Sequence, residues 1–472
     1  MRLLVVGGGI TGLAAAWEAV RGAEGRAPAS VLLVEASGRL GGKIRTEAVD
    51  GLLIEHGPDS FVSYRPAAWE LAQEIGLDHE VIGTSGARTV HLRSRGRLRP
   101  LPAGMGMVLP TRLGPFVTTG ILSPADKARA ALDLVLPRQL IAGQDTSIGT
   151  FLRSRLGGGV VSRFADPMIG GIYGAGVDEL SLDAVLPSLR ADELAHRSLL
   201  LASLAQGRKT RGTRRGPGSP FRTFRRGLGS LVDAVADRLA EAGVDLRVNT
   251  TVAELRPLAG GGAEAILSDG SIEPVDAVVL AGGVAGSAGL LAGPAPKAAA
   301  SLGEVPLATS SVVTLAYPVD AFPTPPTSHG WLEAEPAPIS GITVSSSKWA
   351  GRAPHDTVLI RAFVPERLGS IATGPDDVLV ARVADHLGHV LALTAPPRLT
   401  RIARWNQVMP KYTVGHLARV AAADAGLAHL PGWRLAGSAL RGVGVPDCVA
   451  DGRRQAGLAL DRARVSADRV TS

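Results

Sequence analysis

Cysteine is almost absent from this chain of 472 residues, which contains a single one, Cys448. One cysteine excludes a disulfide within the chain and any metal site built from several cysteines, and it is consistent with a reducing compartment. Aromatic residues make up only 4% of the sequence, which leaves few rings from which to build an aromatic cage. No run of about 18 or more uncharged apolar residues occurs, so we expect no membrane-spanning helix.

Histidines are scattered singly along the chain, and no pair has the spacing of metal ligands. We therefore predict no metal site, and we expect His56 and His91 to be structural or solvent-exposed. No Ser/His/Asp cluster is visible, so we assign no catalytic side chain. The sequence has no internal repeat. A strand predicted from residue 2 leaves no room for a signal peptide, and we expect a cytoplasmic protein.

Acidic residues are fewer than basic ones, with a formal net charge of +7 and a sequence pI of about 10.0. The basic residues gather in the stretches 88–99 and 208–226. Such a balance is typical of contact with nucleic acid, with anionic lipid or with a polyanionic small substrate, and also of solvated surface arginine. No nucleic-acid motif or interleaving of aromatic and basic residues accompanies it, so we expect no nucleic-acid partner. The length predicts two or three domains.

The most informative stretch is the first one. Residues 2–6 are largely apolar, as in a buried parallel strand, and lead into the pattern G-x-G-x-x-G at 7–12 and then an Ala-rich segment. In this pattern the first glycine makes the tight turn, the second lets the backbone approach a pyrophosphate, and the third lets helix pack on strand. A second predicted strand, 31–34, ends in Glu35, which is placed to bind a ribose hydroxyl. The pattern predicts dinucleotide binding and leaves NAD and FAD both open.

Three further stretches extend this site. Residues 39–43, RLGGK, combine paired glycines with a lysine, and a strand at 51–55 leads into the turn Gly57-Pro58-Asp59-Ser60. Residues 433–462 repeat the order strand, glycine-rich turn and helix, so a second helix N-terminus can face the ligand. A cofactor enclosed by both ends of the chain is more typical of permanently bound FAD than of exchanging NAD.

The rest of the chain divides by pattern. Residues 105–205 are mostly helical, with Ser123 and Pro124 as a cap and first residue of one helix. The Gly/Arg/Pro-rich stretch 207–220 predicts an exposed loop. A buried parallel strand at 276–281 returns to the nucleotide sheet, and 305–400 predicts an α+β unit. We therefore expect a nucleotide domain made of 1–85, 221–300 and 400–472, a substrate domain made of 86–104 and 301–399, and a helical domain at 105–220.

Several of these stretches are more specific in combination. Residues 57–60, 164–176 (FADPMIGGIYGAG), 180–182, 224–231 and 442–448 resemble the protoporphyrinogen/coproporphyrinogen oxidase family of the flavin amine-oxidase superfamily. The resemblance covers the whole chain and is greatest with the soluble Gram-positive type, which acts on coproporphyrinogen III. It implies an α/β fold: a Rossmann-like FAD-binding domain of the amine-oxidase/p-hydroxybenzoate-hydroxylase type, an α+β substrate domain and a helical insertion.

The resemblance also implies which residues contact FAD. The glycine loop would lie at the pyrophosphate, residues 35–36 at the adenosine ribose, and Val252, through its backbone, near adenine. The turn at 57–60, Trp405 and residues 443–445 would lie near the isoalloxazine. The full set is Gly7, Gly8, Gly9, Ile10, Thr11, Gly12, Glu35, Ala36, Lys43, Gly57, Pro58, Asp59, Ser60, Val252, Trp405, Val443, Gly444 and Val445.

For the substrate, the resemblance implies that Arg88 meets a propionate. A flat apolar slot has four candidates: Met168, Ile169, Ile172 and Tyr173. The chemistry implied is the removal of six electrons in three hydride transfers to N5 of FAD, with dioxygen as oxidant and hydrogen peroxide as product. Because aromatisation drives this reaction, no strong general base is needed.

Alternatives stay open at this point. Within the family the runner-up is protoporphyrinogen IX oxidase. An FAD-dependent amine oxidase is more distant, since Cys448 is not arranged for covalent flavin attachment. A non-catalytic flavoprotein that docks on a membrane surface through 105–205 is a third reading. The sequence leaves open the oligomeric state, contact with a ferrochelatase and regulation by haem.

Overall fold

A five-stranded parallel sheet organises both ends of the chain. The computed structural model describes residues 1–22, 29–86, 90–141, 143–212, 220–259 and 261–471. In strand order the sheet comprises β10 (Asp245–Arg247), β2 (Ser30–Val34), β1 (Arg2–Val6), β14 (Ala277–Leu280) and β20 (Trp433–Leu435). All four pairings are parallel. Three of the strands come from separate thirds of the chain, as the predicted three-segment nucleotide domain requires.

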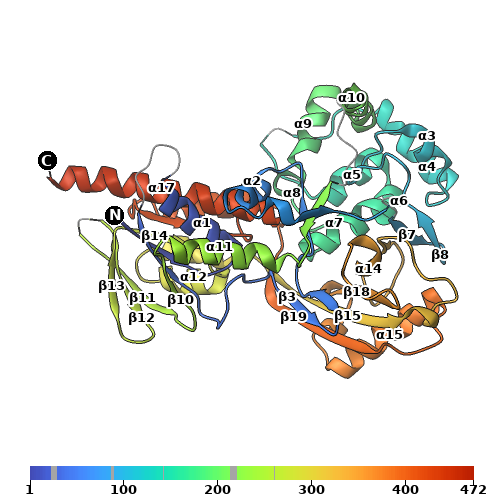
Figure 1. Cartoon of the computed structure of the whole chain (residues 1–472). Coiled ribbons are helices and arrows are strands. Elements are labelled where there is room, and N and C mark those ends of the chain that lie inside the picture. The colour runs from blue at the N-terminus through green and yellow to red at the C-terminus, as the bar shows by residue number, and fades with distance from the viewer. Residues whose placement is uncertain (23–28, 87–89, 142, 213–219, 260, 472) are drawn as a thin grey trace.

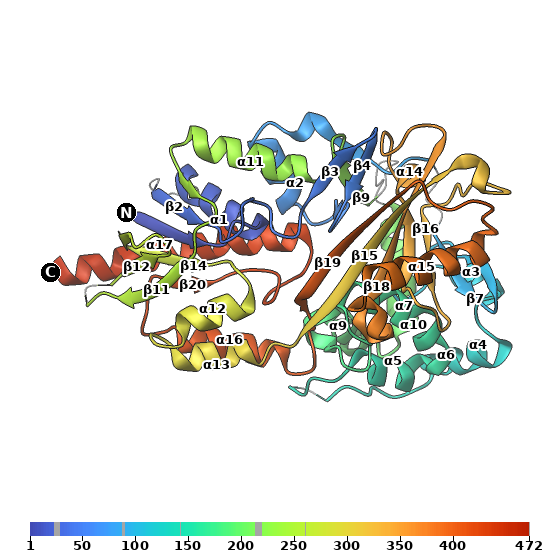
Figure 2. The ribbon, with the colours of Figure 1, turned by 90° about the horizontal axis from the view of Figure 1, so that it is seen from below.

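Both faces of this sheet are covered, which explains the continuous apolar runs in its strands. Leu3, Val5 and Leu33 point into a core shared with α1 (Ile10–Arg21), α11 (Gly229–Glu241) and α17 (Val445–Thr471). Leu4 and Leu32 point into a second core on the opposite face. That face is covered by β11 (Val252–Pro257), β12 (Ala263–Leu267), β13 (Ile272–Val275), α12 (Val284–Leu291), α13 (Pro296–Gly303) and α16 (His416–Gly426). Figure 2 shows α11 on one side of the domain and α12, α13 and α16 on the other.

The first and last helices of the domain cross at very close range. A Cβ atom on Gly452 of α17 would lie 2.1 Å from the carbonyl oxygen of Thr11 in α1. Only glycine allows this approach, and the crossing fixes the C-terminal helix beside the N-terminal loop.

A seven-stranded sheet forms the second region, at the lower right of Figure 1. Its strands, in order, are β19 (Leu399–Pro410), β15 (Leu307–Pro318), β18 (Thr357–Pro365), β17 (Gly341–Val344), β16 (Gly330–Glu333), β7 (His91–Ser94) and β8 (Arg97–Pro100). The pairing of β16 with β7 is parallel and the others are antiparallel. Helix α15 (Asp376–Leu391) packs on the sheet through Leu379, Val383 and Leu387. The short α14 (Ser345–Lys348) follows β17, and η4 (Val319–Ala321), η5 (Glu366–Leu368) and η6 (Ser370–Ala372) are single 3-10 turns.

The boundary expected at residue 400 is misplaced. Strand β19 pairs with β15 from Leu399 to Pro410, so these residues belong to the substrate-domain sheet and not to the nucleotide domain. Strand β19 is rich in polar residues and half-buried, so its sequence does not resemble that of the apolar central strands of the sheet.

The helical region occupies the upper right of Figure 1. Its elements are α3 (Leu113–Thr118), α4 (Pro124–Ala131), η2 (Leu132–Leu134), α5 (Ile148–Leu156), α6 (Gly158–Val160), η3 (Val161–Ala165, one π-helical turn), α7 (Asp166–Tyr173), α8 (Leu182–Val185), α9 (Pro187–His196) and α10 (Leu199–Gly212). Ser123 and Asp126 form a capping box at the start of α4, with Pro124 at the first helical position as predicted. Part of the loop expected at 207–220 is helical, because α10 continues to Gly212; residues 213–219 lie outside the described part of the chain.

Two small sheets and one helix join these regions. Strands β3 (Thr46–Val49) and β4 (Leu52–Glu55) form a hairpin, and β9 (Phe221–Phe224) lies between β5 (Phe61–Val62) and β6 (Val81–Gly83). Helix α2 (Ala67–Glu74) and the 3-10 turn η1 (Asp78–Glu80) connect β5 to β6. Among the described residues, no helix combines the length and apolarity needed to cross a membrane.

Candidate functional site

The glycine loop between β1 and α1 has the geometry of a phosphate-binding turn. Gly7 adopts a φ of +109°, and a Cβ on Gly12 would lie 1.9 Å from the Gly7 carbonyl oxygen. In contrast, a Cβ on Gly9, the N-cap of α1, would meet nothing within 4 Å among the described residues. No side chain caps this helix end, so its first N–H groups and positive dipole end remain available to an anion. The loop is tight where the fold needs it and open where a pyrophosphate would lie.

Glu35 ends β2 beside this loop. Its Oε2 accepts a hydrogen bond from the Gly8 N–H at 2.7 Å, and its Oε1 accepts from the Ser37 N–H at 2.8 Å and from Ser37 Oγ at 2.6 Å. These bonds fix the carboxylate in place. Each carboxylate oxygen can accept about two hydrogen bonds, so Oε2 keeps capacity for a ribose hydroxyl. Ala36, the next residue, is exposed at the same edge.

The RLGGK stretch closes over the loop. The Gly41 N–H donates to the Gly8 carbonyl at 2.8 Å, and a Cβ on Gly42, at φ +57°, would lie 3.2 Å from the Gly9 Cα. Lys43 follows, and its ammonium group donates to Oγ of Ser438 at 3.0 Å. Burial lowers the pKa of Lys43. The lysine therefore carries a desolvated charge between the N-terminal loop and the C-terminal segment.

The turn before α17 is held by Tyr412. Its hydroxyl donates to the Ser438 carbonyl at 2.8 Å and accepts from the Gly442 N–H at 2.7 Å. The ring stacks on His416 with centroids 3.9 Å apart, and burial raises the pKa of the phenol. The predicted contacts Val443, Gly444 and Val445 follow directly, and Val445 is buried in the core between the sheet and its helices.

The turn at 57–60 lies against Lys43 of the RLGGK stretch. A Cβ on Gly57 would lie 1.9 Å from the Lys43 carbonyl oxygen and 3.5 Å from Cζ2 of Trp405. The indole N–H of Trp405 donates to the His56 carbonyl at 2.9 Å. Asp59 accepts hydrogen bonds from Lys348 Nζ at 2.8 Å and from the Trp349 indole at 3.1 Å. Trp405, which reaches the turn from β19, is thus a neighbour of Gly57.

Asp59 is ionised throughout the normal pH range. Burial by itself would raise the pKa of its carboxyl, but the charges of Lys348 and Arg361 outweigh burial and hold that pKa well below its usual range. Ser60 Oγ also donates to Oδ1 of Asp59 at 2.7 Å. The side chain of Asp59 is therefore committed to protein partners, and the parts of the turn left to face a cofactor are the backbone and the rings beside it.

The other expected contacts differ in how far the structure places them. Ile10 and Thr11 are buried in the first turn of α1. Val252 is buried in the core between the two sheets, so only its backbone is placed to meet an adenine. Cys448 is buried behind the loop, and burial raises the pKa of its thiol to about 11. That thiol is therefore protonated and unreactive at neutral pH.

The expected substrate contacts separate in the structure. Arg88 lies outside the described residues. On α7, Ile172 is 43% exposed and Met168 is half-buried, whereas Ile169 is 0% exposed within the helical core. Ile169 is therefore a packing residue and does not line a slot, because residues one apart on a helix face different sides. Tyr173 packs against Tyr412 with the two rings tilted and their centroids 5.4 Å apart, and burial raises the pKa of Tyr173 to about 12.

The helix α7 reaches the large sheet at its C-terminal end. A Cβ on Gly174, which ends α7 at φ +61°, would lie 3.2 Å from Cβ of Ala308 in β15 and 3.6 Å from Cβ of Met409 in β19. Close by, Arg65 forms an ion pair with Asp447 at the start of α17. Tyr173 thus lies between the helical region, the sheet and the glycine turn at 442–444.

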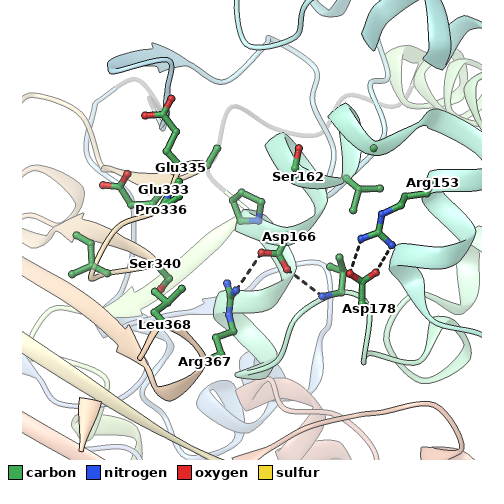
Figure 3. Close-up of a pocket in the computed structure, with 16 residues that line it drawn as sticks. Arg153, Ser162, Asp166, Asp178, Glu333, Glu335, Pro336, Ser340, Arg367 and Leu368 are labelled. Carbon is green, nitrogen blue, oxygen red and sulfur yellow. Dashed lines mark hydrogen bonds and ion pairs between the residues drawn. The ribbon is translucent and has the colours of Figure 1, made fainter. Parts of the chain in front are cut away.

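A charged pocket of about 440 Å³ lies between the helical region and the sheet (Figure 3). Arg153 pairs with Asp178 at 2.5 Å, and Arg367 pairs with Asp166 at 3.2 Å. Glu333 and Glu335 also line it, so carboxylates outnumber guanidinium groups. This lining disfavours a substrate that carries carboxylates. None of the expected cofactor residues lines the pocket, and we assign it to the junction between the two regions.

The basic stretch 88–99 is partly neutralised by the same acidic residues. Arg93 lies 3.5 Å from Glu333 and 3.8 Å from Glu335, whereas Arg95 and Arg97 are exposed on the β7–β8 hairpin.

Among the described residues, no group of three or more His, Cys, Asp or Glu side chains could hold a metal ion.

The residues around the loop fit FAD. Contacts connect Gly8 to Gly41, Lys43 to Gly57 and Ser438, and Gly57 to Trp405, so one continuous site runs from β1 to the start of α17. The open space at Gly9 and the spare acceptor capacity of Glu35 match the pyrophosphate and ribose of a dinucleotide. Lys348, Arg361, Tyr412 and Ser438 were missed from the sequence. The one signal available was Arg361, a charge inside the apolar strand 357–365.

Comparison with known proteins agrees with this geometry. The family model described as flavin containing amine oxidoreductase matches residues 10–460. The coproporphyrinogen III oxidase of Propionibacterium freudenreichii subsp. freudenreichii is 54% identical over 492 residues, which cover 98% of this chain and 91% of that protein. The coproporphyrinogen III oxidase of Bacillus subtilis (strain 168) is 33% identical, with 97% of each chain covered. A crystal structure from Exiguobacterium sp. 255-15, provisionally named protoporphyrinogen oxidase, has a TM-score of 0.83 at 31% identity and covers 98% of this chain and 99% of that one.

Proposed function

The chain belongs to the flavin-containing amine oxidoreductase family, and on that basis we propose that it oxidises coproporphyrinogen III to coproporphyrin III with bound FAD and dioxygen. The observation that carries the proposal is the relative named coproporphyrinogen III oxidase, 54% identical over 98% of this chain. This relative agrees with the resemblance to the Gram-positive type of the family that the sequence indicated. The glycine loop, Glu35 and the 57–60 turn supply the site that such a reaction requires.

When bound, FAD supplies the hydride acceptor, and three two-electron oxidations, each coupled to reduction of one dioxygen to hydrogen peroxide, remove the six electrons. The chain's own residues bind and orient. The uncapped N-terminus of α1 at Gly9 would hold the pyrophosphate, and Glu35, whose Oε2 already accepts from the Gly8 N–H, would accept a hydrogen bond from a ribose hydroxyl. Trp405 and the turn at Gly57 form a rigid wall because the indole N–H is bonded to His56.

The substrate macrocycle lies against α7 in this proposal. Met168 and Ile172 present apolar side chains, and Tyr173 is fixed by its contact with Tyr412. A flat porphyrinogen fits an apolar wall, because burying its ring surface is favourable and its carboxylates can stay at the rim. We assign no general base, since formation of the aromatic product drives proton loss.

The test compares two substrates in air. Purified protein is supplied with coproporphyrinogen III or protoporphyrinogen IX, and porphyrin fluorescence and hydrogen peroxide are followed together. We expect faster porphyrin formation from coproporphyrinogen III, with three peroxide molecules for each porphyrin, and no turnover without dioxygen. Faster formation from protoporphyrinogen IX would support the second candidate, which the Exiguobacterium structure favours. Porphyrin from neither substrate would contradict both.

We further propose a cytoplasmic location, which the single cysteine fits. The sequence-based expectation of peripheral membrane contact concerns the helical region, where Val117, Val135 and Ile141 are exposed. The expected ferrochelatase contact has no assigned surface. Sedimentation with anionic vesicles and co-purification with a ferrochelatase test these two contacts separately. A protein that stays in the supernatant and elutes alone has neither.

A further inference from the structure

A cluster of buried charges lies directly behind the 57–60 turn. Lys348 ends α14, Arg361 lies in the middle of β18, and both reach Asp59 from the substrate-domain sheet. The distances are 2.8 Å from Lys348 Nζ to Oδ2 of Asp59 and 3.6 Å from Arg361 Nη1 to the same oxygen. Arg361 Nη2 also donates a hydrogen bond to the Gly57 carbonyl. Two cations of one domain thus hold both ends of a turn in the other.

The cluster continues through Arg352 and Glu55. Arg352 is 1% exposed, donates to the carbonyls of Arg225 and Phe224, and lies 3.9 Å from Oε1 of Glu55. Glu55 in turn accepts from the Leu228 N–H at 2.7 Å. Burial is the largest influence on Glu55 and raises its pKa, and burial lowers the pKa of both arginines. The whole group is therefore shielded from water. In this interior of lower dielectric constant, charges act over longer distances than they do in water.

The charges in this cluster do not balance. Lys348, Arg352 and Arg361 are three cations, and Asp59 and Glu55 are two carboxylates, which leaves a net charge of +1 with all groups ionised. The neighbouring Glu47 pairs with Arg401 at 2.9 Å and adds no net charge. The Nε atoms of Arg361 and Arg352 are buried and have no hydrogen-bond partner within the described part of the chain. The excess positive charge lies behind the turn that faces the flavin in the proposed site.

We propose that Lys348 and Arg361 are positioning residues that fix the 57–60 turn and also set the reduction potential of the flavin through the net positive charge of their cluster. This inference rests on the proposed function, because it requires FAD beside the turn. Two-electron reduction with uptake of one proton adds negative charge to a flavin, and a nearby buried cation stabilises that charge. The cluster therefore favours acceptance of electrons from a porphyrinogen.

The experiment uses two substitutions that change the net charge in opposite directions. Lys348→Met removes one cation and keeps the apolar stem, and Asp59→Asn removes one anion and keeps the shape. Flavin content, thermal stability and the two-electron midpoint potential are measured for each purified protein. Lys297→Met, at an exposed position of α13, is the matched control for loss of a lysine.

We expect Lys348→Met to lower the midpoint potential and Asp59→Asn to raise it. Each change corresponds to roughly a tenfold shift in the equilibrium between oxidised and reduced flavin, or about 30 mV for a two-electron couple. Lys348→Met/Asp59→Asn restores the net charge and is expected to return the potential toward that of the wild type. Lys348→Arg keeps the charge and the potential. A purely structural role would destabilise both single variants without opposite shifts in potential.

Each outcome has a defined meaning. Potentials that do not move, or that move in the same direction in both single variants, contradict the inference while leaving the proposed function intact. If Asp59→Asn does not fold, a double variant with the same potential as Lys348→Met contradicts it equally. A wild-type protein that is purified without flavin and takes up none from added FAD contradicts the proposed function and this inference together.

Discussion

The ammonium group of Lys43 donates a hydrogen bond to Oγ of Ser438 over 3.0 Å, and this bond joins residues 395 positions apart in the chain. Lys43 follows the glycines that close over the N-terminal loop, and Ser438 precedes the helix that ends the domain. Lys43 is therefore placed both to join the segments and to present a positive charge to a cofactor.

Replacing Lys43 tests this dual role. We expect Lys43→Met to weaken FAD binding about tenfold or more, because a charge-assisted hydrogen bond contributes about 1.5–3 kcal/mol. Titration of the deflavinated protein with FAD, followed by fluorescence quenching, measures the dissociation constant. Lys297→Met, exposed on α13, is the control. Equal dissociation constants for the two variants would show that Lys43 does not contribute to FAD binding.

Two glycine substitutions, one at the crossing of α1 and α17 and one in α12, should change the free energy of unfolding in opposite directions. Gly452→Ala puts a methyl group 2.1 Å from the Thr11 carbonyl oxygen, and we expect the free energy of unfolding to fall by about 1–3 kcal/mol. Gly286→Ala, in α12, meets nothing within 4 Å among the described residues and should raise it by about 0.4–1 kcal/mol. Denaturant unfolding of both variants measures the difference. A stabilised Gly452→Ala variant would mean that the two helices separate easily.

Two buried tyrosines form a matched pair for testing the turn before α17. Tyr412→Phe removes the hydroxyl that bonds to Ser438 and Gly442, and we expect a loss of about 1–3 kcal/mol and lower FAD occupancy. The hydroxyl of Tyr317 is buried with no hydrogen-bond partner in the described part of the chain, so Tyr317→Phe should be neutral or stabilising. Thermal unfolding and the ratio of flavin to protein absorbance report both effects. Equal losses in the two variants would contradict the assignment of Tyr412.

Stability should decline as pH falls below neutrality, with His416 contributing. Its ring is 0% exposed, its Nε2 lies 2.9 Å from the Leu440 carbonyl, and burial lowers its pKa. Below the unfolded pKa of about 6.5, the unfolded chain binds a proton that the folded chain does not, so the free energy of unfolding falls with pH until the folded pKa is reached.

Burial also lowers the pKa values of His56 and His91, which act in the same direction. Unfolding measured between about pH 7.5 and about pH 5.5 gives the slope. His416→Gln cannot titrate, so its slope should be smaller than that of the wild type whatever its absolute stability. An unchanged slope would show that His416 does not contribute.

Much of the nucleotide site was predictable because local sequence dictates local geometry there. The glycines at 7, 9 and 12 and the acid at 35 lie within one strand–helix–strand unit, where each residue type has a distinct steric or hydrogen-bonding reason. The capping box at Ser123 and the parallel strand at 277–280 were also predictable, since a cap and an apolar run depend on few neighbours.

The places where prediction failed depend on neighbours distant in sequence. Ile169 and Ile172 are equally apolar, and only the packing of α7 decides that the first is buried and the second 43% exposed. Strand β19 looks like a boundary segment until β15 pairs with it along its length. The boundary at 400 was wrong for that reason.

By itself the sequence determined a dinucleotide loop, a three-segment parallel sheet and the family resemblance, because these are written in glycine spacing and strand hydrophobicity. Only the tertiary structure decided which charges meet behind the 57–60 turn. Asp59 lies 289 residues from Lys348, and no periodicity relates a turn of one domain to a helix end of another. A buried ion pair is a property of two surfaces in contact, and the unequal numbers of cations and carboxylates form one buried cluster only once those surfaces are folded together.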